Sequence, residues 1–539
     1  MQEQVKDIAR AVQTKFAQRP ALRHDPIPPE QPYPDAQYVF LVGAVPRKYA
    51  GRTASILHKT RLWYEHYGIE SLIVPAVPTP EMDDLEHHFR ETGALADGVR
   101  IKPLLDFYPD DTVGTPVLHE LEEPGLRWLK EESQPVYRFY DDMGVYRVYK
   151  RLDYAGRLIV KDYFGENRIR TRRDEFRTDG TLRRSAFMDP QLNEPRQEIL
   201  YAHDGTPQYA RWTLYDQDDY QLHTQRIVFF GPDGAPVREE FKYDPIIHTC
   251  LDQIVGDKLT FITCEDRKAD REFLTYANPN VRKLVVYHNT HIKEPYTDIH
   301  SFRPMFMPLL SNPKKVDAEV FLTESQRADV EAHFGKNEKF RVIPHTVHDP
   351  VLAEGVERDP NLVIMMARLH PQKHVEHAIE AFKYVVKAKP QARLEIYGRG
   401  DQKLYLESVI RRMGVGDSVK LMGFTDNPSL VYQRASVCIL TSRYEGQSLT
   451  VLEALMHSCP MVSYDLRYGP SEFIQDGVNG FLVPNRSIRA LAKRVVQILD
   501  DKALRDRMVA NARPSVEKFD TATFLRRWGG LLNELAGKK

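Results

Sequence analysis

The chain has 539 residues, a length that predicts about three or four domains. Its 75 basic and 76 acidic residues leave a net charge of −1, so no global field steers it toward nucleic acid or an anionic membrane. With 42% hydrophobic and 28% charged residues it has a globular composition, and its longest apolar run, Tyr38–Pro46, is far shorter than the ~20 residues of a membrane span. We expect no nucleic-acid partner.

Two features favour a cytoplasmic location. Residues 1–13 mix charges with apolar side chains and have no hydrophobic centre, so they do not form a secretory signal. The cysteines are too few for a disulfide framework and lack paired metal-ligand spacing, and we expect them to be buried free thiols: Cys250, Cys264, Cys438 and Cys459.

Residues 1–35 are predicted to form a helix and a proline-rich linker. Apolar side chains recur on one helical face over residues 1–19, and six prolines then end any helix. Docking of this helix onto the protein is favoured over contact with the inner face of a membrane, which is the alternative.

Residues 36–95 and 246–345 are predicted to form one parallel α/β domain. Residues 38–45 indicate a buried strand, a glycine-containing loop follows, and a helix to about His66 precedes a strand at 71–77. This order begins a parallel α/β layer, and short apolar strands return after residue 246.

Residues 96–245 interrupt this pattern and are predicted to form an antiparallel β-rich insertion. Strands rich in Val, Ile, Tyr, Phe and Arg alternate with Asp-Gly turns at 179–180, 204–205 and 233–234. Its arginines predict either a basic face that follows a polyol-phosphate chain or cross-strand ion pairs: Arg168, Arg170, Arg172, Arg173, Arg177, Arg183 and Arg184.

Residues 346–520 are predicted to form a second doubly wound α/β domain, and residues 521–539 a C-terminal helix. Apolar strands recur from 362–369 to 480–484, each followed by a helix-like stretch. The expected fold class is therefore α/β, with two parallel domains and an insertion in the first.

The segment from Thr441 to Glu453 carries the first candidate site. A strand ends at Thr441, a loop carries Glu445, and a helix begins near Ser448, so a helix N-terminus lies at the carboxyl edge of a sheet and suits a phosphate. Glu453 can accept hydrogen bonds from a ribose diol and Glu445 from a sugar. Two glutamates in ordinary surface and first-turn positions are the alternative.

The second candidate site is the loop that carries Arg368 and Lys373. It directly follows the strand LVIMM, so both cations project from the same sheet edge. A guanidinium fork and an ammonium together suit a diphosphate leaving group, and two solvated loop cations are the alternative.

Together, R-x4-K (Arg368 to Lys373) and E-x7-E (Glu445 to Glu453) resemble retaining glycosyltransferases of the GT-B fold, family 4. The resemblance covers about 36–95 and 246–520 and implies two Rossmann-like doubly wound domains facing a cleft. Further segments agree with it, namely FLTESQ, VIPH, IYGRGD, GF and DGVNGFLVP, at 321–326, 342–345, 396–401, 423–424 and 476–484.

The insertion and the segment 464–472 narrow the resemblance to enzymes that glycosylate wall teichoic acid. Poly(glycerol-phosphate) α-glucosyltransferases and poly(ribitol-phosphate) N-acetylglucosaminyltransferases are similar, and adhesin Ser/Thr glycosyltransferases share the insertion. The resemblance implies a UDP-glucose or UDP-N-acetylglucosamine donor as substrate, no cofactor, and a polyol-phosphate polymer or Ser-rich protein as acceptor. It also implies a homo-oligomer, a trimer, formed through the insertion.

The resemblance assigns a role to each donor-site residue. Arg368 and Lys373 neutralise the diphosphate, Glu445 contacts the transferred sugar, and Glu453 holds the ribose. Amides near the sugar and phosphate are expected around Gln447, Ser448 and Leu449.

Further positions match the family. His288 matches a histidine near the donor sugar, with His291 a second candidate, although His288 taken without the family is more often a structural histidine. Gly51 matches a glycine loop against the diphosphate, and Gly398 lies in the glycine-rich donor segment. Ala50 stands where the family has a second glycine and departs from the pattern.

We expect no metal site. The D-x-D sequence at 216–218 falls in a predicted turn, where Asp is common, and Arg368 and Lys373 can replace a cation. A glycosidase would need two carboxylates flanking one bond and predicts no basic diphosphate site.

The sequence therefore predicts a metal-independent hexosyltransferase that moves glucose from UDP-glucose to a glycerol-phosphate-type teichoic acid at the inner face of the membrane. A protein Ser/Thr glycosyltransferase and a non-catalytic acceptor-binding subunit are the alternatives. The second would lack donor-site residues that this sequence has.

Overall fold

A computed structural model describes residues 32–47, 49, 51–77, 82–132, 134–153, 155–216, 221–267, 270–350 and 352–537. The helix predicted over residues 1–19 and Ala50 lie outside these ranges. The described chain divides into two compact units: unit 1 holds 36–49 and 69–281, and unit 2 holds 32–35, 51–68 and 282–537. Each unit is described by itself below.

Unit 1 contains four strands of a parallel sheet, in the order β14-β1-β2-β3. Five of the six residues of β1 are buried, because a parallel strand is covered on both faces and carries an unbroken apolar run. The elements around these strands are β1 (Gln37–Val42), β2 (Ser71–Pro75), α3 (Met82–Glu91), β3 (Val99–Ile101), η1 (Leu104–Phe107), α4 (Asp244–Val255), β14 (Thr260–Cys264) and α5 (Asp270–Thr275).

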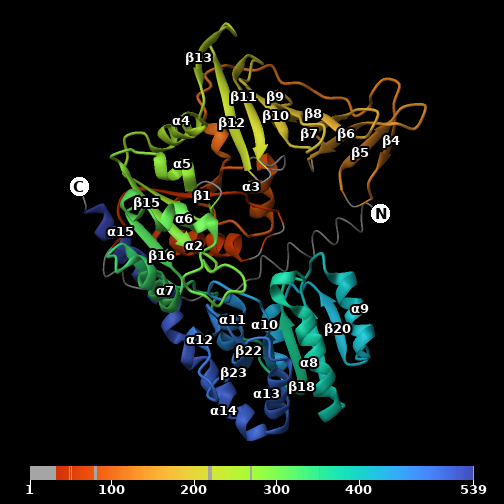
Figure 1. Cartoon of the computed structure of the whole chain (residues 1–539), viewed down its shortest axis with the longest axis vertical. Helices are drawn as coiled ribbons and strands as arrows, with labels where there is room; N and C mark the ends of the chain where they lie inside the picture. Colours follow the sequence, from red (N-terminus) through yellow and green to blue (C-terminus); the bar gives the residue numbers. More distant parts are fainter. Residues whose placement is uncertain are drawn as a thin grey trace. The chain divides into compact units, whose positions relative to one another are not determined.

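Between β3 and α4 the chain forms the predicted insertion, a ten-stranded antiparallel sheet in which sequence neighbours pair from β4 to β13 (Figure 1). Glycines at the predicted Asp-Gly turns, such as Gly180 and Gly205, have positive φ. The strands are β4 (Arg127–Lys130), β5 (Val136–Tyr140), β6 (Tyr146–Leu152), β7 (Leu158–Phe164), β8 (Arg170–Phe176), β9 (Leu182–Met188), β10 (Pro195–Tyr201), β11 (Pro207–Asp216), β12 (Gln221–Phe230) and β13 (Pro236–Glu240).

Three of the predicted arginines, Arg170, Arg173 and Arg184, take part in cross-strand ion pairs. Arg184 of β9 lies between Glu175 of β8, at 2.7 Å, and Glu198 of β10. Arg173 of β8 donates two hydrogen bonds to Asp162 of β7, at 2.7 and 2.8 Å. Cross-strand ion pairing, the second of the two interpretations, therefore describes these three arginines.

Unit 2 contains three further parallel strands, in the order β17-β16-β15. Trp63 of α2 packs edge-on against Trp528 of α15, with ring centroids 5.8 Å apart. The elements are α2 (Arg52–Tyr67), β15 (Val281–Tyr287), η3 (Pro304–Phe306), α6 (Met307–Leu310), η4 (Pro313–Lys315), β16 (Ala318–Phe321), α7 (Glu324–Phe334) and β17 (Phe340–Val342).

The second parallel sheet has six strands in the order β20-β19-β18-β21-β22-β23, the doubly wound order that reverses between β18 and β21. Its core side chains, such as Val363 and Ile396, are fully buried. The strands are β18 (Asp359–Met366), β19 (Arg393–Tyr397), β20 (Val419–Gly423), β21 (Ala435–Leu440), β22 (Met461–Asp465) and β23 (Gly480–Pro484).

Helices connect and cover these strands (Figure 1), and the chain reaches the predicted C-terminal helix, α15. They are η5 (Pro371–Lys373), α8 (Val375–Ala388), α9 (Lys403–Met413), α10 (Pro428–Arg434), α11 (Leu449–Met456), α12 (Pro470–Phe473), α13 (Ile488–Asp500), α14 (Lys502–Ala512), η6 (Pro514–Phe519) and α15 (Thr521–Ala536). The predicted fold class is confirmed: two parallel α/β sheets and an antiparallel insertion.

One smaller expectation, for the cysteines, is also met. The four cysteines are buried and free. No helix within the described ranges is long and apolar enough to cross a membrane.

Candidate functional site

The candidate site lies at the carboxyl ends of β18 and β21, the neighbouring strands at which the order of the six-stranded sheet reverses. Connections leave such a pair toward opposite sides and open a crevice, the usual ligand position in a doubly wound sheet. The loop after β18 carries Arg368 and Lys373, and the loop after β21 carries Glu445. The topology therefore brings together the two motifs that the sequence pairs.

An ion pair joins the two loops. Lys373 Nζ lies 2.6 Å from Glu445 Oε1, and both side chains are largely buried, with exposed fractions of 15% and 8%. Gln372 links the two loops further. Its side-chain amide donates to the backbone carbonyl of Tyr444 at 3.1 Å, and its own backbone carbonyl accepts from the backbone N–H of Arg443 at 2.7 Å. The ammonium and the carboxylate are thus held in place by backbone contacts.

Arg368 differs from Lys373 because its side chain is exposed. One Nη donates to Gln372 Oε1 at 3.2 Å, and the other N–H groups of the guanidinium have no partner within the described chain. A planar fork with free donors can bind phosphate oxygens in a bidentate manner.

The start of α11 provides uncharged donors. Ser448 precedes the helix with a left-handed backbone (φ 68°), so the chain turns sharply before Leu449 begins the first turn. Its buried hydroxyl oxygen has no hydrogen-bond partner within the described chain, and buried hydroxyls are normally bonded. An unpaired hydroxyl beside free helix N–H groups suits an anionic oxygen.

Glu453 lies one turn further along α11. Tyr432 donates a hydrogen bond to its Oε2 at 3.1 Å, while Oε1 accepts none from the described residues. Burial raises the pKa of this carboxyl, and the Tyr432 hydrogen bond and the charge of Lys373 oppose the rise. One carboxylate oxygen is therefore available for a hydroxyl.

Gln447 and His288 are connected through His345. The Gln447 amide accepts from the backbone N–H of His345 at 2.7 Å and donates to its carbonyl at 3.0 Å. Nδ1 of His288 lies 3.1 Å from Nε2 of His345, and the rings stack. The side chain of Gln447 thus positions the segment that supports His288.

Two glycines allow close approach of backbones in the site. A Cβ at Gly446 would lie 2.2 Å from the carbonyl oxygen of His288, and one at Gly398 would lie 1.8 Å from that of Ala367. Gly398 also has a φ of +146°, which side chains rarely adopt. Both the backbone angle and the close contact therefore explain why a glycine stands at this position. Gly51, by contrast, has open space around its Cβ position and precedes α2 with a φ of 56°.

His291 is buried between aromatic rings. It stacks on Phe302 and Tyr468, with centroids 4.8 and 5.7 Å away, and its exposed fraction is 1%. Burial lowers its pKa to about 4. This environment indicates a packing role for the second histidine candidate.

The fold brings three further residues into the site: Tyr432, which sequence reasoning missed, and His345 and Gly469, which it named only within the family-like segments 342–345 and 464–472. A Cβ at Gly469 would lie 2.3 Å from the carbonyl oxygen of Gln447. The Gly469-Pro470 pair before a short helix was a usable signal. Tyr432 carries no local signal, and the segment VIPH does not reveal the contacts of His345, because the partners of both residues are distant in sequence.

The described residues include no group of three or more His, Cys, Asp or Glu side chains placed to hold a metal ion. Asp216 ends β11, and Asp218 lies outside the described ranges.

Comparison with known proteins finds relatives that are glycosyltransferases. Residues 353–515 match the family described as Glycosyl transferases group 1. The chain is 25% identical over 519 residues to the poly(glycerol-phosphate) alpha-glucosyltransferase of Bacillus subtilis (strain 168), covering 93% of this chain and 76% of that protein.

Two further comparisons agree. The chain is 26% identical over 413 residues to the poly(ribitol-phosphate) alpha-N-acetylglucosaminyltransferase of Staphylococcus aureus (strain COL), covering 75% of this chain and 79% of the relative. The crystal structure of the pneumococcal O-GlcNAc transferase GtfA in complex with UDP and GlcNAc has the same fold, with a TM-score of 0.72 and 20% identity over 94% of this chain and all of that one.

Proposed function

We propose that this chain, which matches the group 1 glycosyl transferases over residues 353–515, transfers glucose from UDP-glucose to a hydroxyl of a glycerol-phosphate-type teichoic acid polymer, with retention at the anomeric carbon. The observation that carries this proposal is the basic and hydroxyl-lined edge at β18 and β21, in a chain similar over 93% of its length to a poly(glycerol-phosphate) alpha-glucosyltransferase. Its place of action is the cytoplasmic side of the membrane.

The donor diphosphate gains negative charge as the glycosidic bond breaks. Arg368 has guanidinium donors free for it, and Lys373 has ammonium protons beyond the one directed to Glu445. The hydroxyl of Ser448 and the first N–H groups of α11 add neutral donors. Fixed donors that meet developing charge lower the barrier without reorganisation of solvent.

The remaining residues hold the donor's sugars. Oε1 of Glu453 can accept from a ribose hydroxyl, Glu445 can accept from the transferred sugar, and His288 lies on the opposite loop, where its carbonyl meets Gly446. The acceptor hydroxyl then attacks the anomeric carbon from the face that the diphosphate leaves. The acceptor proton passes to the departing phosphate oxygen, which balances the step.

We propose that the reaction needs no metal ion, since Arg368 and Lys373 supply the positive charge. Oligomerisation through the insertion, as a trimer, belongs to the same proposal. A protein Ser/Thr glycosyltransferase is the second candidate, supported by the likeness of fold to GtfA.

The test is release of UDP by the purified full chain. UDP-glucose and UDP-N-acetylglucosamine are each supplied with poly(glycerol phosphate) or a Ser-rich peptide, with and without EDTA. We expect release from UDP-glucose, dependent on the polymer and indifferent to EDTA. Release only with the peptide would transfer the protein to the second candidate, and no release at all would favour a non-catalytic acceptor-binding subunit.

Removal of either cation should slow the reaction. We expect Arg368→Ala and Lys373→Ala each to lower turnover by roughly 10²–10³-fold, the loss typical of one donor to transition-state charge. Arg412→Ala and Lys383→Ala, at exposed positions of α9 and α8, serve as matched controls with unchanged turnover. Wild-type turnover in both site variants would contradict the diphosphate role.

A further inference from the structure

Unit 1 contains a cavity of about 650 Å³ that the proposed reaction does not use. This volume lies within the ~300–1,000 Å³ of small-molecule sites. Its walls come from α3, the segment from β3 to η1, and the β8–β9 and β10–β11 turns of the insertion. Charged and polar side chains from these four elements face it, including Arg90, Arg100, Lys102, Arg177, Arg183 and His203.

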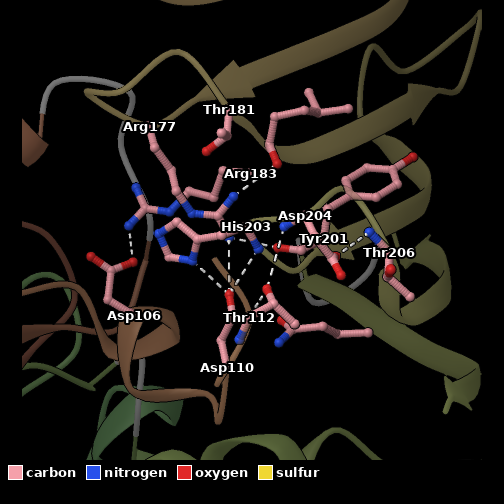
Figure 2. A network of polar contacts seen from close by, with 12 residues as sticks. Asp106, Asp110, Thr112, Arg177, Thr181, Arg183, Tyr201, His203, Asp204 and Thr206 are labelled. Atoms are coloured by element: carbon pink, nitrogen blue, oxygen red, sulfur yellow. Dashed lines mark hydrogen bonds and ion pairs between the residues drawn. The ribbon is translucent and has the colours of Figure 1, made fainter. Parts of the chain in front are cut away.

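The wall is held by close backbone contacts. A Cβ at Gly180 would lie 1.8 Å from the carbonyl oxygen of Val117, and one at Gly114 would lie 2.2 Å from that of His203. The segment around residues 110–119 is therefore pressed against both turns. Figure 2 shows Asp110 of this segment beside His203, whose backbone N–H and ring Nδ1 lie 2.9 and 2.7 Å from Oδ2.

The acidic groups on one side of the cavity are already bonded. Glu86 accepts from Arg90 Nη2 and Arg100 Nε, both at 3.0 Å, and from the backbone N–H of Ile101 at 2.8 Å. Asp106 forms an ion pair with Arg183 (Figure 2). These carboxylates have their charge and much of their hydrogen-bonding capacity used within the wall.

The other two acids are bonded as well. Asp110 accepts from Thr112 and His203, and these hydrogen bonds hold the pKa of its carboxyl below the ordinary value against the opposing effect of burial. Asp179 accepts from the backbone N–H and hydroxyl of Thr181, at 2.9 and 2.7 Å. The acids therefore act as supports of the wall.

Lys102 is a cation of the cavity that has no carboxylate partner among the described residues. Its ammonium lies 4.3 Å from the ring centroid of Phe107. Partial burial lowers its pKa, and the positive charges of Arg100 and Arg183 lower it further. The terminal N–H groups of Arg100 also lack partners among the described residues. An anion between these side chains would relieve their mutual repulsion.

Neutral groups beside the cations suit hydroxyls. The second ring nitrogen of His203 and the side-chain oxygen of Gln208 have no partner among the described residues. Tyr108, which carries the one benzene ring among the described residues that line the cavity, packs edge-on against Tyr209. A nucleic acid would require open aromatic faces for its bases, whereas a polyol phosphate requires cations and hydrogen-bonding groups.

We propose that this cavity binds a phosphodiester of the polyol-phosphate acceptor, with Lys102 and Arg100 on the phosphate and His203 and Gln208 on neighbouring hydroxyls. The proposal rests on the proposed function for the identity of the polymer. The cavity is built from unit 1 and the donor-site residues belong to unit 2, so a substitution can alter acceptor binding while it leaves donor binding intact.

The test is calorimetric titration of the full chain with short poly(glycerol phosphate), without donor. We expect Lys102→Gln to weaken binding by about 10- to 100-fold, the loss expected for a hydrogen bond to a charged group. Log affinity against log salt should become shallower by about 0.7 for each phosphate that the variant no longer neutralises, as for a flexible polyphosphate strand. Lys102→Arg should retain most of the affinity.

The matched control is Lys258→Gln, an exposed lysine of unit 1 outside the cavity, which should bind as wild type. Equal melting temperatures of both variants exclude a folding defect. Wild-type affinity in Lys102→Gln would overturn the proposal. Inorganic phosphate or a Ser-rich peptide that binds the cavity as tightly as the polymer would overturn it too.

Kinetics separate this proposal from the function on which it rests. With polymer as acceptor, Lys102→Gln should raise KM by the same factor and leave kcat at saturation unchanged. If wild type and variant glycosylate the polymer with equal KM, the proposal that the cavity binds the polymer is wrong, while the proposed function is supported. If wild type binds the polymer through Lys102 but does not glycosylate it, the proposed function is wrong, while the proposed binding in the cavity is supported.

Discussion

At the scale of single residues, Arg368 and Lys373 are not equivalent, although one sequence motif contains both. Lys373 is already paired with Glu445 at 2.6 Å, while Arg368 is exposed and keeps most of its donors free. A bound diphosphate would share the ammonium with Glu445 but could occupy the guanidinium outright. Loss of Lys373 would also release Glu445, so its effect extends to sugar placement.

Glu453 offers a test in which binding and stability change in opposite directions. Because its pKa is raised by burial, the folded state disfavours its charge, and this cost is present above the ordinary carboxyl pKa. We expect Glu453→Gln to raise the melting temperature at pH 8 and to weaken UDP binding about 10-fold, since an amide is a poorer acceptor for ribose. Thermal unfolding and calorimetry measure the two effects.

The same variant gives a pH dependence. As pH falls through the raised pKa, wild-type Glu453 becomes protonated and UDP binding weakens, whereas the Gln variant shows no such step. Identical pH profiles for the two proteins would show that this carboxylate does not hold the donor.

Residue spacing alone located Arg368, Lys373, Glu445 and Glu453, because each follows directly from a strand end or lies in the helix after it. The contacts of His345 could not be found in this way, although the segment 342–345 that contains it matches the family. Its contacts with Gln447 and His288 bridge about 100 and 57 residues of sequence, and no local pattern reports such a pairing.

At the scale of elements, the loop between β21 and α11 depends on Gly446. A Cβ added at this position would lie 2.2 Å from the His288 carbonyl oxygen, a backbone atom that cannot rotate away. We expect Gly446→Ala to cost about 1–3 kcal/mol of folding free energy by overpacking and to lower turnover, because it displaces Glu445. Denaturant unfolding and UDP release measure both effects.

The control is Gly530→Ala in the middle of α15, where a Cβ meets nothing within 4 Å. Alanine there should stabilise the protein by about 0.5–1 kcal/mol, because glycine is a poor helix former. If the two substitutions had the same effect, the close approach at His288 would have no energetic importance.

The antiparallel insertion was predictable as an element because Asp-Gly turns occur between its β-rich runs, and Gly180 and Gly205 adopt the positive φ that such turns require. Whether the arginines of the insertion form ion pairs was not predictable. Whether Arg184 faces solvent or two glutamates depends on the register of β8, β9 and β10, which sequence alone does not set.

At the scale of the whole molecule, His291 links stability to pH. Its pKa of about 4 means that the unfolded chain, with an ordinary histidine pKa near 6.5, takes up a proton that the folded chain refuses. Folding stability should therefore fall as pH drops from about 6.5 to 4, by up to about 3 kcal/mol. As pH falls through this range, the melting temperature of the wild type should drop more than that of His291→Leu, and a constant difference between the two would contradict the link.

The division of the molecule was the least predictable feature. The doubly wound order of β18–β23 follows from alternating strands and helices, but α2 belongs to unit 2 through contacts with α15, more than 450 residues away. We keep the segments 1–35, 36–95 with 246–345, 96–245, 346–520 and 521–539 as a proposal that limited proteolysis can test.

The pairing of β1 with β14 also has a consequence for synthesis. Gln37 pairs with Thr260, so roughly 220 residues must leave the ribosome after β1 before its second partner can join the pair that β1 forms with β2, a delay of about 10–45 s at ordinary elongation rates. The insertion, whose strands pair with their immediate successors, needs no such delay and can form as it emerges. The edge of β1 that faces away from β2 stays open over this interval and can pair with wrong partners, so a nascent-chain chaperone that covers this edge would be of most use then.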